Sequence, residues 1–162
     1  MSELLHGLKP LVGDRPQLLI LGNMPSVLSL ASGQYYGNPR NAFWRIIGSL
    51  FGFDADAPYS ERVTALRAHR VAVWDVLRSC RRDGSLDSSV RPDSMVPNDF
   101  EGFFTAYPTL RRVVFNGAAA EKNFRQLVGT SPVHGVRAPS TSPAQTMRFE
   151  DKLTAWRAAV AG

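Results

Sequence analysis

The chain has 162 residues, of which 44% are hydrophobic and 20% charged, proportions typical of one globular domain, and we expect that domain to span residues 1–162. One cysteine, Cys80, and three scattered histidines predict no disulfide framework, metal site or bound cofactor. No apolar run approaches the ~20 residues of a membrane helix, and the N-terminus is unlike a signal peptide, so we expect a cytoplasmic monomer. The net charge of +5 favours a polyanionic partner, although the arginine usage of a GC-rich genome would give the same balance.

Apolar runs, each ended by a polar or turn-forming residue, predict four β-strands. They cover residues 17–21 (ended by Gly22), 71–74 (ended by Asp75), 111–115 (ended by Asn116-Gly117) and, more briefly, 132–137 before Pro139. Unbroken apolar runs are typical of strands covered on both faces, as in a parallel sheet.

Apolar stripes at helical spacing follow these strands. The stripes are Phe43/Ile46/Ile47/Leu50, Phe100/Phe103/Phe104/Tyr107, Ala120/Phe124/Leu127/Val128 and Phe149/Leu153/Trp156/Val160. Because strands and helices alternate, we predict an α/β fold with three α/β/α layers around a central four-stranded parallel sheet. Residues 79–98, which include Gly84, Pro92 and Pro97, are expected to form a long surface connection.

The polar strand ends are expected to meet at one edge of the sheet, where open α/β sheets bind their ligands. The polar side chains of residues 35–44 are expected to lie near this edge. Asn38 is a preferred N-cap and Pro39 suits the first helical position, so we expect a helix to begin there. Asn41 then lies in the first turn, off the apolar stripe, with its amide facing the pocket. The alternative is that this amide bonds to the loop backbone and holds the turn.

Further polar and aromatic residues near this edge allow two interpretations each. The rings of Tyr35 and Tyr36 could stack on a nucleobase or pack on the core. Asp75 and Asn116 could face a ligand or cap the segments that follow their strands. Three charged residues of the long connection are interpreted as parts of a solvated loop: Arg81, Arg82 and Asp87.

Residues 140–142 (Ser-Thr-Ser) precede Pro143, and Gln145 stands three residues after Ser142, a spacing typical of a capping box. We expect a helix to begin here. Hydroxyls and backbone amides at a helix N-terminus bind phosphate well, although a helix cap without a ligand would have the same sequence.

Three motifs in order make the chain resemble the uracil-DNA glycosylase superfamily over about residues 18–156. Residues 22–26 (Gly-Asn-Met-Pro-Ser) resemble its first motif, and residues 37–44 resemble the following segment of mismatch-specific uracil glycosylases. Residues 139–144 resemble its last motif, the loop that presses into the DNA minor groove. The resemblance implies a uracil-DNA glycosylase-like fold and a base-excision enzyme that hydrolyses the N-glycosidic bond of a flipped, deaminated base.

Two positions depart from the uracil enzymes. Met24 stands where the superfamily usually has an Asp or Asn that acts on water, and Ala138 replaces the histidine of the last motif. The combination is most similar to the hypoxanthine-DNA glycosylase, or deoxyinosine glycosylase, branch. For that branch the resemblance implies that Asn41 supplies the catalytic amide and that Asn116 is functional as well.

The predicted roles follow from this resemblance and from base chemistry. Asn41 positions the attacking water, Tyr36 stacks on the base, and the Asp75 carboxylate accepts the ring N–H of hypoxanthine while repelling the bare acceptor of adenine. The base-binding residues are predicted to be Asn23, Met24, Tyr36, Asp75 and Asn116, and the DNA contacts Pro25, Ser26, Ser140, Thr141, Ser142 and Pro143. The partner is DNA, single- or double-stranded, that contains deaminated bases.

Other functions remain open at this point. A slow uracil or thymine mismatch glycosylase is one, and a noncatalytic domain that binds damaged DNA is another. A small-nucleotide-binding α/β domain without a role on DNA is the third.

Overall fold

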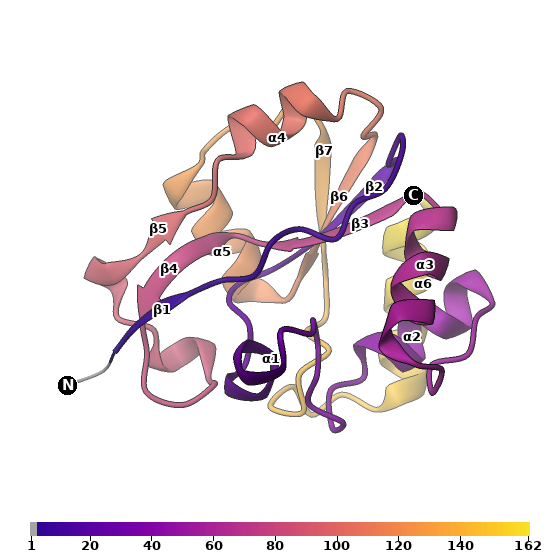
Figure 1. Cartoon of the computed structure of the whole chain (residues 1–162), viewed down its shortest axis with the longest axis horizontal. Coiled ribbons are helices and arrows are strands. Elements are labelled where there is room, and N and C mark those ends of the chain that lie inside the picture. The colour runs from indigo at the N-terminus through magenta and orange to yellow at the C-terminus, as the bar shows by residue number, and fades with distance from the viewer. Residues whose placement is uncertain (1–2) are drawn as a thin grey trace.

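The computed structural model describes residues 3–162. Its centre is a four-stranded parallel sheet in the order β3-β2-β6-β7 (Figure 1). The strands are β2 (Leu18–Gly22), β3 (Val71–Asp75), β6 (Arg112–Asn116) and β7 (His134–Ala138). The predicted α/β fold with a central four-stranded parallel sheet is confirmed.

Helices cover both faces of this sheet, which is why every residue of β2 and β3 is buried. On one side α3 (Tyr59–Ala68) packs against β3, α6 (Phe149–Ala161) packs against β7, and α2 (Phe43–Phe51) contacts α6. On the other side lie α4 (Phe100–Ala106) and α5 (Ala118–Leu127) (Figure 1). The rings of Phe100 and Phe124 join these two helices, with centroids 5.2 Å apart.

The prediction of one long surface connection over residues 79–98 is confirmed for its middle, where residues 83–89 and 91–93 are exposed, and wrong at its two ends. This stretch begins within strand β4 (Leu77–Arg81), which pairs antiparallel with β1 (Leu4–His6) and with β5 (Val96–Pro97). Two short 3₁₀ turns, η1 (Asp87–Ser89) and η2 (Pro92–Ser94), lie between β4 and β5. Only part of β4 is apolar, so its pairing partners decide its conformation more than its own composition does.

The helix expected at Asn38 and Pro39 begins later, at Phe43. Asn38 Oδ1 accepts a hydrogen bond from the backbone N–H of Arg40 at 2.9 Å, and Asn41 Oδ1 accepts one from Phe43 at 2.9 Å. Asparagine side chains often bond to backbone two residues ahead and so compete with helix formation. The residues before Phe43 therefore form a turn.

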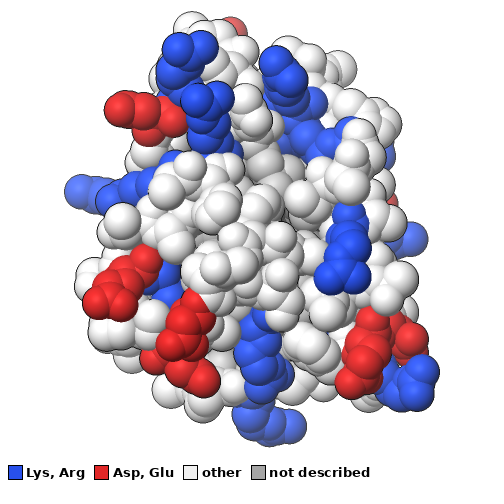
Figure 2. All heavy atoms as spheres, turned by 90° about the vertical axis from the view of Figure 1, so that its right-hand side faces the viewer, with Lys and Arg blue, Asp and Glu red and all other residues white. Residues whose placement is uncertain are grey.

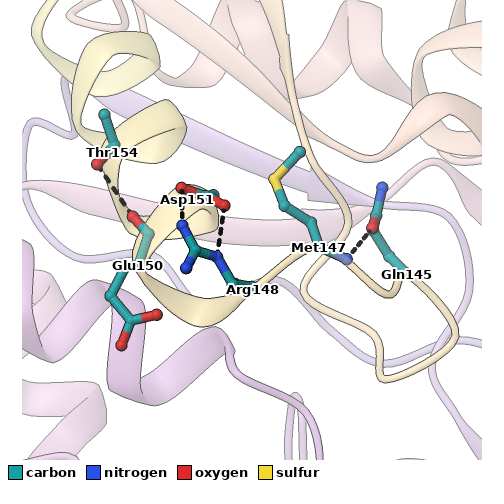
Figure 3. Close-up of polar contacts among 6 residues, drawn as sticks. All are labelled: Gln145, Met147, Arg148, Glu150, Asp151 and Thr154. Atoms are coloured by element: carbon teal, nitrogen blue, oxygen red, sulfur yellow. Dashed lines mark hydrogen bonds and ion pairs between the residues drawn. The ribbon is translucent and has the colours of Figure 1, made fainter.

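No helix begins at Ser142 either, so the predicted capping box is wrong. Ser142 Oγ accepts from the N–H of Ala144 at 3.2 Å, and Gln145 Oε1 accepts from the N–H of Met147 at 2.7 Å (Figure 3). Both side chains close turns, and α6 begins only at Phe149.

Two helices were not anticipated. Helix α1 (Val27–Ser32) follows β2 directly, with Ser26 as its N-cap and Gly33, in the left-handed conformation (φ 70°), at its C-cap. Helix α3 is the other. Within residues 3–162, no helix has the length and apolar character to cross a bilayer.

Candidate active site

The carboxyl ends of β2, β3, β6 and β7 open into a cleft of about 940 Å³. Parallel pairing aligns these ends, since Gly22 pairs with Asp75 and Asn116 pairs with Ala138. Every residue predicted for the site lines this cleft: Asn23, Met24, Pro25, Ser26, Tyr36, Asn41, Asp75, Asn116, Ser140, Thr141, Ser142 and Pro143. Their chemical roles remain predictions.

Asn41 lies in the turn that enters α2. Its Oδ1 accepts a hydrogen bond from the backbone N–H of Phe43, and the N–H of Ala42, which lies between the two residues, donates to the carbonyl of Thr141 at 3.0 Å. Within the described chain, no hydrogen-bond partner of Asn41 Nδ2 is found. The amide is thus oriented by one backbone bond, while both protons of Nδ2 and one lone pair of Oδ1 can bind a ligand.

Asp75 is a buried acid at the end of β3, 4% exposed, and its Oδ2 has no hydrogen-bond partner within residues 3–162. Burial, followed by the negative charge of Asp87, raises the pKa of Asp75 from its ordinary 3.8 to about 7, while Arg82 acts in the opposite direction. Gly22 leaves room for this carboxyl group, because a Cβ there would overlap Asp75 Oδ1 and lie 2.8 Å from Tyr36 Oη.

Asn116 links the two loops that border the cleft. Its Nδ2 donates to Tyr36 Oη at 3.1 Å and to Thr141 Oγ1 at 3.0 Å, and its Oδ1 accepts from the N–H of Thr141 at 2.9 Å. One ring face of Tyr36 stacks on Phe43, with centroids 3.9 Å apart and planes 17° apart. Burial, and then the charge of Asp75, raises the pKa of Tyr36, so its hydroxyl stays neutral at physiological pH.

Tyr35 belongs to the core, as one of its two interpretations expected. It is 3% exposed, and its hydroxyl donates to the carbonyl of Lys9 at 2.9 Å. Its own carbonyl accepts from Trp44 Nε1 at 2.9 Å. These contacts fix the start of the loop that carries Asn41.

A buried polar chain runs behind the first motif. Asn123 Nδ2, on α5, donates to Asn23 Oδ1 at 2.8 Å, and Asn23 Nδ2 donates to Asp87 Oδ1 at 3.1 Å. Because an ionised Asp87 carboxylate can only accept, Asn23 must turn its Nδ2 toward Asp87 and its Oδ1 toward Asn123, and its amide is held in one orientation. Burial raises the pKa of Asp87, and the hydrogen bond from Asn23 and the charge of Arg82 act in the opposite direction.

The interpretation of Arg82 and Asp87 as parts of a solvated loop is wrong. Arg82 is 3% exposed, and its Nη2 donates to the carbonyl of Pro25 at 2.7 Å. Asp87 as a whole residue is exposed, but its carboxylate accepts a hydrogen bond from Asn23, and the residue lines the cleft. One signal was present in the sequence, since Asn123 is a polar residue on an otherwise apolar helix stripe.

The remaining loop residues are held by local bonds. Ser26 Oγ accepts from the N–H of Ser29 at 3.2 Å, and Met24 is 8% exposed within the core. Ser140 Oγ accepts from the N–H of Ser142 at 3.1 Å, and Lys152 Nζ donates to the carbonyl of Ser142 at 3.2 Å. The last motif therefore sits rigidly on α6.

Charge around the cleft is mixed. Arg40 and Arg137 line it together with Asp75 and Asp87. Figure 2 shows that basic and acidic side chains alternate over the face formed by α2, α3 and α6, without one continuous basic patch. Within residues 3–162, no three His, Cys, Asp or Glu side chains are grouped so that they could hold a metal ion.

Fold and site together define a class: an α/β domain with an amide- and carboxyl-lined cleft at the carboxyl ends of its parallel strands, the place where such sheets bind ligands. The chain belongs to the uracil DNA glycosylase superfamily, whose family model matches residues 10–161.

Individual relatives agree with this membership. The chain is 34% identical over 154 residues to a hypoxanthine DNA glycosylase of Methanosarcina acetivorans, covering 94% of this chain and 96% of the relative. It is 35% identical over 113 residues to a hypoxanthine DNA glycosylase of Methanosarcina barkeri, covering 69% and 70%. A solution NMR structure from M. acetivorans, described as a candidate uracil DNA glycosylase, superposes with a TM-score of 0.81 at 33% identity over 96% of each chain.

Proposed function

We propose that this protein is a monofunctional DNA glycosylase that removes hypoxanthine from deoxyinosine in DNA. Its superfamily membership and the names of its relatives support this function. The observation that carries the proposal is the cleft at the strand ends, which brings Asn41, Asp75 and Asn116 to one place from three distant parts of the chain.

Asn41 acts by positioning the attacking water. The C1′–N9 bond breaks with its electron pair leaving on the base, the water oxygen bonds to C1′, and the water proton passes to solvent. Because the sugar gains oxocarbenium character as the base departs, an oriented water needs no strong base beside it. The bond from Phe43 N–H to Asn41 Oδ1 holds the amide in place for this task.

Asp75 recognises the base. Hypoxanthine carries a proton on N1, and this N1–H group donates a hydrogen bond to an ionised carboxylate, whereas adenine has a bare acceptor there that a buried carboxylate repels. Tyr36 offers its ring to the base, and Asn116 holds that ring through the hydroxyl bond at 3.1 Å. Asn23 and Met24 complete the base-binding wall.

The two loops at the cleft border bind the DNA strand. Pro25 and Ser26 lie on one side, and residues 140–143 lie on the other. Backbone N–H groups and hydroxyls of these short polar loops suit phosphate oxygens. The protein acts as a monomer on single- or double-stranded DNA that carries a deaminated base.

Asn41→Ala tests the catalytic assignment. The protein is incubated with a deoxyinosine oligonucleotide, and abasic sites are converted to strand breaks with alkali. We expect the variant to lose the breaks while its melting temperature stays close to that of the unmodified protein. Asn38→Ala is the matched control, since Asn38 lines the same cleft and closes a similar turn at 2.9 Å. Unchanged activity in Asn41→Ala would reject the assignment.

Asp75→Asn tests base recognition. An amide can present either its oxygen or its N–H₂ to the base, so we expect the preference for hypoxanthine over adenine to shrink. The rates on deoxyinosine and deoxyadenosine oligonucleotides give that preference. If the ratio is the same in both proteins, Asp75 does not select the base.

A second candidate substrate is uracil. The ring N–H of uracil suits the Asp75 carboxylate as well, and the superposed solution structure is described as a candidate uracil enzyme. A panel of oligonucleotides, each with one deaminated base, ranks the substrates directly.

A further inference from the structure

A second carboxyl group of the cleft, that of Asp87, has no part in the proposed chemistry. Asp87 opens the turn η1 and lines the cleft. Its Oδ1 accepts a hydrogen bond from Asn23 Nδ2 at 3.1 Å, and within residues 3–162 its Oδ2 has no hydrogen-bond partner. The carboxyl group therefore serves either the loop that carries it or the amide of Asn23.

The nearby charges argue against a role in the loop alone. Burial raises the pKa of Asp87, and the hydrogen bond from Asn23 and the charge of Arg82 oppose this effect. Even so, no ion pair joins Arg82 and Asp87 within the described chain. Arg82 donates instead to the backbone carbonyls of Gly84 at 2.6 Å and Pro25 at 2.7 Å. These two bonds hold the loop to the first motif without the carboxylate of Asp87.

The bond to Asp87 decides what Asn23 can offer to a ligand. Asn23 is buried, and its Oδ1 accepts a hydrogen bond from Asn123 Nδ2 on α5 at 2.8 Å. An ionised carboxylate can only accept, so Asp87 attracts Nδ2 and not Oδ1. One proton of Nδ2 goes to Asp87, and the second has no partner among the residues that the structure describes. Since Asn23 lines the cleft, this second N–H is the hydrogen bond that it can donate to a ligand there.

A donor at this place matches the atom that deamination changes. Deamination replaces an amino group of the base, which donates hydrogen bonds, with a carbonyl group, which accepts them. In hypoxanthine and in uracil, the new carbonyl carbon is bonded directly to the ring N–H that the proposed function assigns to Asp75. In the protein, Asn23 directly follows Gly22, which pairs with Asp75 in the sheet. An acceptor from Asp75 and a donor from Asn23 therefore match two neighbouring groups on one edge of the base.

We propose that Asp87 is a positioning residue for base selection, which turns an N–H of Asn23 toward the carbonyl oxygen that deamination creates. This inference rests on the proposed function, because it needs a base in the cleft. It goes beyond that function, since the choice between a carbonyl and an amino group then depends on a residue that acts through Asn23. An amide that was free to turn would accept from the amino group of adenine as readily as it donates to the carbonyl of hypoxanthine.

The test changes one atom of the base. A deoxyinosine oligonucleotide is compared with one in which sulfur replaces O6, which keeps the ring N–H but is a weak acceptor. Both oligonucleotides are single-stranded, so opening of a duplex does not enter the comparison. The kcat/KM values are measured at about pH 8, where carboxyl groups are normally ionised. The two bases differ in how readily they leave, but this difference is the same for every variant and cancels between them.

In Asp87→Ala we expect the ratio of kcat/KM for the oxygen base to kcat/KM for the sulfur base to fall about fivefold, the effect of losing one neutral hydrogen bond. A loss of stability alone would slow both reactions equally and leave the ratio unchanged. Asp83→Ala is the matched control, since Asp83 is an exposed acid of the same loop that does not line the cleft. Its ratio should equal that of the unmodified protein.

Asp87→Asn is the second variant, and it keeps the size of the side chain if Asp87→Ala does not fold. Its amide can donate as well as accept, so Asn23 is no longer restricted to one orientation and the ratio should fall here too. An unchanged ratio in the variants that fold would overturn the inference while the proposed function stands.

Binding separates this inference from a failure of the proposed function. If the unmodified protein cuts neither oligonucleotide, the proposed function fails, and the dissociation constants of the two uncut oligonucleotides replace the rates. We then expect the unmodified protein to bind the oxygen base more tightly than the sulfur base, and Asp87→Ala to reduce this difference. Equal binding of both bases by the unmodified protein, or the same difference in Asp87→Ala, would show that Asp87 does not govern the choice.

Discussion

Replacing Asp75 with Asn should stabilise the fold in a pH-dependent way. The carboxyl group is 4% exposed, its Oδ2 is unpartnered within the described chain, and Asp87 adds repulsion. An acid whose pKa is raised in the folded state binds its proton more tightly there than in the unfolded chain. Stability is therefore lost as pH rises from the ordinary pKa to the folded one.

The size of the effect follows from the pKa. A rise from 3.8 to about 7 corresponds to ~4 kcal/mol, since a tenfold change in acid dissociation is worth about 1.4 kcal/mol. Part of this loss has occurred by pH 5, so the free energy of unfolding should diverge between the two proteins by about 3 kcal/mol from pH 5 to pH 8. Above pH 8 the difference should be constant. If the amide of Asn packs less well than the carboxyl group, the free energy of unfolding of the variant is lower by the same amount at every pH.

Urea denaturation at intervals of pH measures this divergence. Asp56→Asn serves as the matched control, because Asp56 is exposed and its carboxyl group has no hydrogen bond within residues 3–162. For the control we expect parallel curves. If Asp75→Asn also runs parallel to the unmodified protein from pH 5 to pH 8, the Asp75 carboxyl is ionised at low pH, and the reasoning from its burial is wrong.

Three more outcomes follow from the same site. Below pH 7 the protonated Asp75 can donate a hydrogen bond to N1 of adenine, so the preference for hypoxanthine over adenine should fall as the pH drops. Cleavage rates on deoxyinosine and deoxyadenosine oligonucleotides from pH 5.5 to 8.5 measure this preference. Gly22→Ala places a methyl group against Asp75 and 2.8 Å from Tyr36 Oη, so glycosylase activity should fall at least about tenfold, whereas thermal melting should show a stable fold. Asn123→Leu leaves Asn23 Oδ1 without its hydrogen-bond donor, so the free energy of unfolding, measured by urea denaturation, should fall by about 1–3 kcal/mol. The KM for deoxyinosine DNA should rise. Unchanged stability would show that Asn23 finds another donor.

The sheet could be predicted from the sequence because its strands are covered on both faces. A doubly buried strand needs an unbroken apolar run, and residues 18–21 and 71–74 have one. Strand β4 has no such run, since Arg78 and Arg81 are exposed and its hydrogen bonds go to β1 and β5. Pairing with strands distant in sequence leaves no local pattern to read.

Helix α3 was not predicted because Arg62 stands where its apolar stripe would continue. Only Val63 and Leu66 are buried in it, too few to mark a helix face. The guanidinium of Arg62 lies 4.7 Å from the ring centre of Trp44 and does the packing of an apolar side chain. Such a contact depends on a partner that the local sequence does not show.

Sequence could likewise predict one part of the candidate site and not another. Residues at strand ends, such as Asp75 and Asn116, could be placed at one cleft from sequence, because parallel strands align their carboxyl ends. The contacts of Arg82 and Asp87 could not, since they bond across more than 50 residues of chain to the first motif. Side-chain hydrogen bonds over such distances have no periodic signature.

The placement of charge around Asp75 separates a structural role from a functional one. A carboxyl group kept only for stability would be paired with a cation or with backbone N–H groups, which lower its pKa. Here the second acid, Asp87, already accepts a bond from Asn23, while the buried cation, Arg82, donates to backbone carbonyls of Pro25 and Gly84. The charge of Arg82 therefore offsets the burial of Asp75 only in part, and within residues 3–162 no hydrogen bond reaches Asp75 Oδ2, which lies at the wall of the cleft. If Asp75 binds the base as proposed, a ring N–H of that base would supply the missing hydrogen-bond donor, and substrate binding would recover the cost in stability.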